Sequence, residues 1–289
     1  MLTESARAPR RGPADQRLVF GCVPDPQTRA RVQTALRGHA TLQWFGSFDE
    51  IRRALEHGER AVTAVIALSD AAGGTAMKFA HDVHDDMTGT PVVVCCDLGH
   101  DDPAPLAALA EAGVHDILIA GMNDEGHAAR TVIFGASLGS AADVVMRSLG
   151  SSIPDVLNRF VDLAARRPRE LQRVGDVAAA LGVPRQTLGR WCRTQGYIRP
   201  EELLVWARIF LVVALLESTS RTLESIAAEL CYGSPTALRN RIRDYTGMTA
   251  TQIRDGGLDL VLAVFARRVD EVRAATAPKS ARTSAASAG

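Results

Sequence analysis

Residues 177–190 read VAAALGVPRQTLGR, and residues 226–240 read IAAELCYGSPTALRN. Both stretches have a short Ala-rich helix, a turn that contains glycine, a proline at the start of a second helix, and a leucine among basic residues. This order is typical of a helix-turn-helix, whose second helix can enter the major groove of DNA. A single match is common by chance, so the repetition is what makes the pattern informative. The sequence therefore predicts binding to double-stranded DNA.

The second helix of each repeat carries side chains suited to reading bases. We expect these recognition helices to run from about Pro184 to Gln195 and from about Pro235 to Tyr245, with Ser234 as an N-cap. Arg pairs with guanine edges, and Asn or Gln with adenine edges. An ordinary solvated helix face is the alternative, and the repetition disfavours it. The predicted DNA-binding residues are Arg185, Gln186, Arg190, Arg193, Ser234, Thr236, Arg239, Asn240 and Arg243.

A third predicted helix, residues 201–217, joins the two repeats. Its 17 residues span roughly 25 Å at about 1.5 Å per residue. A spacer of that order can hold two recognition helices about one DNA turn, roughly 34 Å, apart. Both helices can then enter successive major grooves on one side of the duplex. Leu188, Trp191, Trp206 and Leu238 are expected to be core residues rather than base-stacking ones.

Together these features resemble the AraC/XylS family of transcriptional regulators over about residues 171–254. The connector helix and the ending YTGMTATQIR at residues 245–254 also match that family's layout. The chain departs from the family where Cys192, Leu238 and Ile242 replace aromatic residues and Ala250 replaces a proline.

The resemblance implies a role for each exposed residue of the recognition helices. Arg193 and Arg243 lie farther along their helices and are better placed for phosphates. The base-reading positions that the resemblance implies are Gln186, Arg190, Thr236, Arg239 and Asn240.

The first half of the chain alternates short apolar runs with helical stretches. We expect five strands, over residues 18–23, 41–45, 61–68, 91–96 and 114–119. A helix is expected after each, over residues 29–37, 49–57, 76–86, 105–112 and 123–138. This alternation predicts an α/β domain with a five-stranded parallel sheet covered by helices on both faces, a flavodoxin-like or receiver-like fold. An all-α double helix-turn-helix domain follows it.

The predicted domain limits follow from these patterns. They are a disordered leader at 1–14, a receiver-like domain at 15–138, a helical linker at 139–168, the DNA-binding domain at 169–257, a C-terminal helix at 258–273 and a disordered tail at 274–289. The C-terminal helix is amphipathic. Its apolar face can either pack on its own domain or serve as a dimerisation surface.

The α/β half resembles the receiver domain of two-component response regulators. In working receivers, two acidic residues after the first strand bind Mg²⁺, an Asp after the third accepts the phosphoryl group, and a Thr or Ser and a Lys contact it. Here only Asp25 is acidic after the first strand. Ser69 rather than Asp70 takes the acceptor position, while Cys96 and Ala120 replace the hydroxyl and the lysine. We therefore predict a degenerate receiver, with phosphorylation of Asp70 as the alternative.

Charge, cysteines and other polar clusters narrow the function further. The net charge is zero, but the charges are unevenly distributed. Residues 14–150 carry 10 basic and 18 acidic side chains, whereas residues 151–257 carry 15 basic and 11 acidic ones. Five cysteines without CxxC spacing indicate buried thiols. His81, His84 and Asp85 share one helix face, and Asp97, His100, Asp101 and Asp102 form an acidic loop. We interpret both as solvated surface and predict no metal site.

These observations predict a transcription factor rather than an enzyme, because no nucleophile is paired with a base. No secretory signal is present, and the longest apolar run, residues 209–216, is far below the roughly 18 residues of a membrane span. We expect a cytoplasmic homodimer that needs no cofactor, with RNA polymerase or a regulatory protein as a further partner. Two alternatives remain: a phosphorylation-dependent response regulator, and a protein–protein adaptor that no longer binds DNA.

Overall fold

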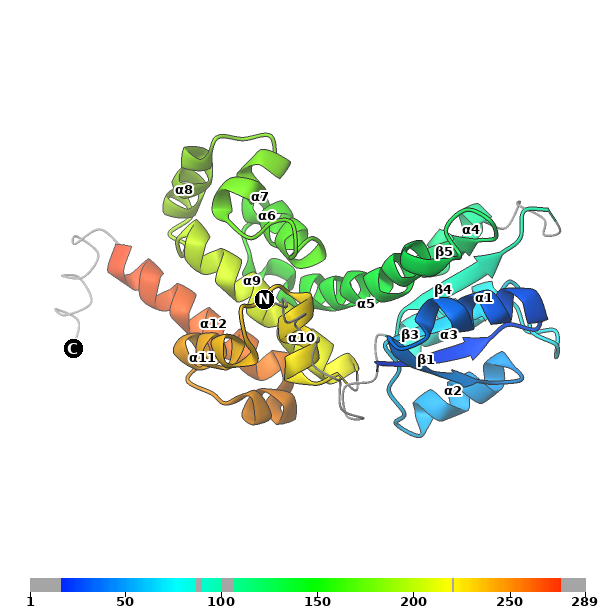
Figure 1. Cartoon of the computed structure of the whole chain (residues 1–289). Helices are drawn as coiled ribbons and strands as arrows, with labels where there is room; N and C mark the ends of the chain where they lie inside the picture. The colour runs from blue at the N-terminus through cyan, green and yellow to red at the C-terminus, as the bar shows by residue number, and fades with distance from the viewer. Residues whose placement is uncertain (1–16, 87–89, 100–105, 220, 277–289) are drawn as a thin grey trace, which may run out of the picture. The chain divides into compact units, whose positions relative to one another are not determined.

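A computed structural model describes residues 17–86, 90–99, 106–219 and 221–276 (Figure 1). The chain divides into two compact units. The first contains the described residues up to Ser137 together with Thr219–Ser225, and the second contains Leu138–Ser218 and the chain from Ile226 onward. The predicted leader and residues 277–289 of the predicted tail lie outside the described residues.

Five parallel strands form the sheet of the first unit. They are β1 (Arg17–Cys22), β2 (Ala40–Trp44), β3 (Thr63–Ala67), β4 (Val92–Cys96) and β5 (Asp116–Ile119). Their order is β2-β1-β3-β4-β5, which is the order of flavodoxin-like and receiver domains. Parallel pairing needs a crossover between strands, and the helices supply it. The fold class predicted from the sequence is confirmed.

Helices cover both faces of this sheet. They are α1 (Pro26–Leu36), α2 (Phe48–Glu56), α3 (Ala76–Asp86), α4 (Leu106–Glu111) and the first part of α5 (Gly126–Leu149). Alternate residues of β4 point to opposite faces: Val92 and Val94 pack with α2, α3 and α4, whereas Val93 and Cys95 pack with α1 and α5. The sheet is therefore buried on both sides, which explains why β3 and β4 read as continuous apolar runs.

Helix α5 differs from its prediction. The sequence predicts that one helix ends at residue 138 and that a separate helical linker follows from 139, but a single helix runs from Gly126 to Leu149. Glycine inside a helix costs only about 1 kcal/mol, so Gly135 and Gly139 do not end it. The division between the units falls within this helix, and the predicted linker segment, residues 139–168, lies in the second unit.

Helix α5 is also apolar along much of its length. Among the described residues, the stretch 126–152 is the one helix long and apolar enough to cross a membrane by length and composition. The uninterrupted apolar runs do not reveal this helix, because glycine, serine and charged residues separate its apolar side chains. Half of the apolar window is buried inside the protein, as in a core helix.

The second unit is helical. Its helices are α6 (Asp155–Arg166), α7 (Val174–Ala180), α8 (Arg185–Thr194), α9 (Pro200–Ser218), the part of α10 (Leu223–Glu229) from Ile226 onward, α11 (Pro235–Thr246) and α12 (Ala250–Thr276). A kink at Gly257, with a φ of 67°, divides α12. The kink coincides with the start of the C-terminal helix that the sequence predicts at residue 258.

Helix α9 forms the core of the second unit. Every residue from Ile209 to Leu215 is at most 1% exposed, so the longest apolar run of the chain is a core helix. The ring of Phe265, from α12, packs against Trp206 and Phe210 of α9, with ring centroids 5.3 and 5.1 Å away. The apolar face of the C-terminal helix is thus used within its own domain.

Candidate nucleic-acid interface

The first helix-turn-helix consists of α7 and α8. Val177 and Leu188 are fully buried and hold the two helices together. Gly182 ends α7 with a φ of 69°. The amides of Gly182 and Val183 donate to the carbonyls of Ala179 and Ala178, both at 3.0 Å, which is the Schellman pattern that ends a helix.

The second helix-turn-helix, α10 and α11, repeats this backbone. Cys231 and Tyr232 donate to the carbonyls of Ala228 and Ala227 at 3.4 and 2.9 Å. The left-handed residue of this turn is Cys231, with a φ of 57°, rather than the nearby Gly233. The two stretches that share a sequence pattern therefore also share one turn geometry.

The recognition helices α8 and α11 begin differently. Ser234 caps α11, because its Oγ accepts from the amide of Ala237 at 3.1 Å, and Pro235 occupies the first turn. This confirms the predicted N-cap. Helix α8 has no side-chain cap, and the extended Pro184 precedes it.

Each recognition helix has one buried and one exposed face. Leu188 and Cys192 of α8, and Leu238 and Ile242 of α11, are buried, while Trp191 is partly buried. All nine predicted DNA-binding residues are exposed, as a DNA-reading face requires: Arg185, Gln186, Arg190, Arg193, Ser234, Thr236, Arg239, Asn240 and Arg243.

Arg185 forms an ion pair across to α9. The guanidinium of Arg185 lies 2.8 Å from a carboxylate oxygen of Glu201 in α9. This hydrogen bond is the main reason why the pKa of Glu201 lies below its usual range. Both side chains are more than half exposed, so the pair adds little to stability. It does direct Arg185 toward α9, away from the other exposed residues of α8.

Helix α9 runs between the two helix-turn-helix pairs (Figure 1). Arg208, near its middle, is hydrogen-bonded to the carbonyls of Pro168 and Leu230 at 2.8 and 2.9 Å. The first carbonyl precedes α7 and the second follows α10. Arg208 therefore ties both pairs to the connector, a tertiary role that the sequence did not reveal.

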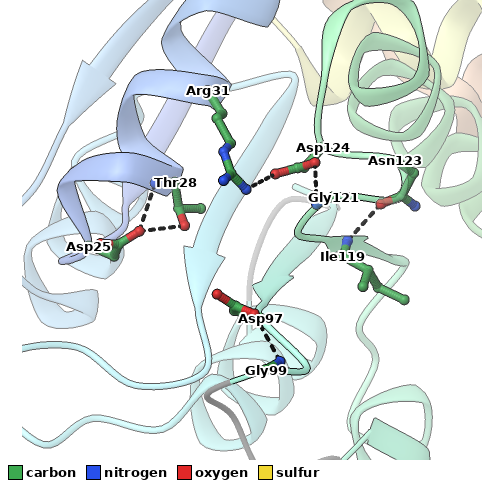
Figure 2. Close-up of polar contacts among 9 residues, drawn as sticks. All are labelled: Asp25, Thr28, Arg31, Asp97, Gly99, Ile119, Gly121, Asn123 and Asp124. Atoms are coloured by element: carbon green, nitrogen blue, oxygen red, sulfur yellow. Dashed lines mark hydrogen bonds and ion pairs between the residues drawn. The ribbon is translucent and has the colours of Figure 1, made fainter.

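At the carboxyl edge of the sheet in the first unit, Asp25 is used as a helix cap. Its carboxylate accepts from the amide and the hydroxyl of Thr28 at 2.7 and 2.6 Å (Figure 2). These two hydrogen bonds, the hydroxyl one first, lower the pKa of Asp25. The acidic residue that follows β1 thus stabilises the start of α1.

Asp70 is buried and held by backbone amides. One carboxylate oxygen accepts from Phe48 at 2.7 Å, and the other from Ala72 at 3.0 Å and Gly74 at 2.7 Å. Burial opposes ionisation of Asp70, but these amide hydrogen bonds, the one from Phe48 first, outweigh it and lower the pKa. Both oxygens are already engaged, so the carboxylate fixes the loop after β3 to the start of α2.

A partly buried ion pair lies at the same edge. Arg31 of α1 points to Asp124, which precedes α5, with a nitrogen–oxygen distance of 2.8 Å (Figure 2). Asp124 is almost fully buried and also accepts from the amide of Gly121 at 2.8 Å. The neighbouring Asp97 accepts from the amide of Gly99 at 2.9 Å. An arginine thus supplies the positive charge beside Asp124.

The described residues contain no group of three or more His, Cys, Asp or Glu side chains that could hold a metal ion. The candidate cluster on α3 includes Asp85, whose side chain is outside the described part, and His100, Asp101 and Asp102 of the acidic loop lie outside the described residues.

Comparisons with known proteins agree with the helix-turn-helix geometry. Residues 177–256 match a family model described as a helix-turn-helix domain, of the AraC type. This confirms the predicted AraC-type domain and identifies a DNA-binding domain of a kind that transcription regulators use. No curated protein sequence matches the chain.

Seven solved chains are similar to this one, and they include the structures of StyR and FixJ. The response regulator StyR has 15% sequence identity, with 75% of this chain and 98% of that chain covered and a TM-score of 0.36. Full-length FixJ from B. japonicum has 12% identity, the same two coverages and a TM-score of 0.34. Because these TM-scores are low, the receiver-like fold is assigned from the strand order of the sheet and not from the similarity to these two structures.

Proposed function

We propose that this protein is a sequence-specific DNA-binding transcription regulator whose receiver-like domain acts without phosphorylation. One observation carries the first part: two repeats of a single helix-turn-helix backbone, joined by a buried connector, each present exposed Arg, Asn or Gln side chains. Binding of this kind positions a protein on DNA and requires no catalytic group.

Base reading is assigned to the middle of each recognition helix. Gln186 and Arg190 of α8, and Arg239 and Asn240 of α11, have the side chains that pair with adenine and guanine edges in the major groove. Thr236 adds a shorter contact. Arg193, Arg243 and the capping Ser234 contact phosphates, which sets the register on the duplex. Arg185 contacts DNA only at the flank of α8, because it is paired with Glu201.

The test is selection of bound sequences from random duplexes with the full-length protein. We expect two short conserved blocks, separated by about one helical turn, for each copy of the protein. Gel shifts across a salt series complete the test, because affinity for DNA must fall steeply as salt rises. No enrichment, together with salt-independent retention, would instead indicate an adaptor that binds proteins.

The engaged carboxylate of Asp70 supports the second part of the proposal. A phosphoryl acceptor needs a free oxygen, and both oxygens of Asp70 accept backbone amides. Asp25, the acidic residue that follows β1, is also engaged, because its carboxylate caps α1 through Thr28. We expect no acid-labile adduct after incubation with acetyl phosphate and Mg²⁺, as measured by intact mass. An adduct that is lost in Asp70→Asn would favour a phosphorylation-dependent regulator.

We further propose a cytoplasmic homodimer that contacts RNA polymerase or a regulatory protein. The predicted domain limits belong to the same proposal. Sedimentation of the free protein and of its complex with a selected duplex gives the stoichiometry. Paired half-sites in the selected sequences would match a dimer, and a single pair of blocks would match a monomer.

A further inference from the structure

The second unit contains a pocket of about 390 Å³ between its two helix-turn-helix pairs. It is lined by residues just before and at the start of α7, at the start of α8, in the first half of α9, in the turn after α10 and in the middle of α11. Its polar lining side chains are Gln172, Arg173, Arg185, Glu201, Arg208, Tyr232 and Arg241.

The lining is strongly positive. Four arginines face one glutamate, and Glu201 is already paired with Arg185. Within the described part of the chain, no carboxylate forms an ion pair with Arg173, Arg208 or Arg241. Arg173 and Arg241 are exposed, and the guanidinium of Arg241 lies 6.0 Å from the centre of the Tyr245 ring. Three of the four arginines of the pocket therefore have no carboxylate partner among the described residues.

Arg208 gives the pocket a fixed donor. Its guanidinium is anchored by the carbonyls of Pro168 and Leu230, and it lies 5.4 Å from the centre of the Tyr232 ring. The Nε atom of Arg208 is buried and has no hydrogen-bond partner among the described residues. This nitrogen faces the surrounding protein rather than the open pocket, so Arg208 contributes its anchored positive charge to the lining.

Arg241 does not belong to the predicted base-reading face. At about 100° per residue, it lies roughly 160° around α11 from both Arg239 and Arg243. It is exposed toward the pocket and α9 instead. Neither Arg241 nor Arg173, which precedes α7, is needed for the proposed reading of bases.

We propose that this pocket binds a phosphate group. A phosphate supplies several acceptor oxygens to converging guanidinium groups, and arginine is the side chain best suited to it. The group can come from the backbone of a duplex held by both recognition helices, or from a free phosphate compound. The first source rests on the proposed DNA binding, and the second does not.

The duplex source is tested by salt dependence. Arg241→Ala and Arg173→Ala are compared with Arg267→Ala, a change at an exposed arginine of α12 outside the pocket. If the phosphate belongs to DNA, each pocket variant lowers affinity about tenfold on selected and random duplexes alike. The slope of log affinity against log salt falls by about 0.9. Arg241→Lys keeps the positive charge and therefore most of the slope. Arg267→Ala leaves the affinity and the slope unchanged.

The free source is tested with pyrophosphate and no DNA. Thermal unfolding is followed in pyrophosphate and in sodium chloride of equal ionic strength. If the phosphate is free in solution, pyrophosphate raises the Tm of the wild-type protein and of Arg267→Ala, but not of Arg241→Ala. Circular dichroism at low temperature confirms that every variant is folded.

The outcomes separate this proposal from the proposed function. Pocket variants that match the wild type in both assays overturn the phosphate site, even if the protein selects DNA sequences. A Tm shift that depends on Arg241, in a protein that selects no duplex, supports the site and overturns DNA reading.

Discussion

Gly182 and Cys231 occupy the same place in the two helix-turn-helix repeats and adopt the same left-handed backbone conformation, with φ of 69° and 57°. At each position the chain turns from the first helix of the pair toward the recognition helix, and the same two backbone hydrogen bonds close the turn. Only one of the two residues is glycine, although left-handed φ values favour glycine.

This difference predicts the effect of exchanging the turn residues. Cys231→Gly removes the strain of a side chain in the left-handed region, and an increased entropy of the unfolded chain offsets part of that gain. We expect a net stabilisation of about 0.5 kcal/mol, measured by urea unfolding. The reciprocal change, Gly182→Ala, introduces the strain and costs about 1 kcal/mol. A loss of stability in Cys231→Gly would show that the thiol, which is exposed, has a role of its own.

Arginines in the middle of the recognition helices are predicted to read bases. Arg190→Ala or Arg239→Ala should weaken binding to the selected sequence by about 1–3 kcal/mol, because a bidentate contact to guanine is lost. Binding to random duplex should change much less. Quantitative gel shifts on both duplexes measure the ratio of the affinity for the selected sequence to the affinity for random duplex. An equal loss on the two would reassign these arginines to phosphates, the role that we give to Arg193 and Arg243.

The buried carboxylate of Asp70 should stabilise the first unit. Asp70→Asn replaces one acceptor oxygen by an amide group that faces backbone donors, so we expect a loss of about 1–3 kcal/mol at neutral pH. Glu59→Gln, at an exposed glutamate, is the matched control and should be neutral. Urea unfolding of both variants provides the measurement.

The same residue predicts a pH dependence. The pKa of Asp70 is lower in the folded than in the unfolded chain. Its contribution is therefore complete above the unfolded value of about 3.9 and is lost as the pH falls through the folded value. The stability difference between the wild type and Asp70→Asn should narrow below about pH 4. A difference that stays constant down to pH 2.5 would contradict the lowered pKa.

Phe265 of α12 is predicted to be a core residue of the DNA-binding unit. It is 1% exposed and packs against three aromatic rings, so Phe265→Ala should cost about 3–5 kcal/mol. Leu260→Ala, at a 41% exposed position of the same helix, should change stability little. Sedimentation should show no change of oligomeric state for either variant under native conditions. Dissociation of a dimer in folded Leu260→Ala would assign this helix to an interface after all.

Local patterns in the sequence determined most of the elements. Apolar runs separated by helical stretches predicted the five parallel strands, and the repeated helix-turn-helix pattern predicted both recognition helices to within about two residues. Such features depend on hydrogen bonds and side-chain periodicity over a few residues, which the sequence displays directly. The sequence predicts α9 as the connector of the two repeats. The burial of this helix explains why so many of its residues are apolar.

The tertiary structure alone decided how the polar side chains are used. Arg31 and Asp124 are 93 residues apart in the chain, yet they form one partly buried ion pair. Asp70 accepts hydrogen bonds from backbone amides of its own loop and of Phe48, 22 residues earlier in the chain. The arginine pocket draws on five segments of the second unit. Sequence patterns fix which residues face inward, but a polar group's partner depends on which distant elements the fold brings beside it, because the hydrogen bond acts only within about 3 Å.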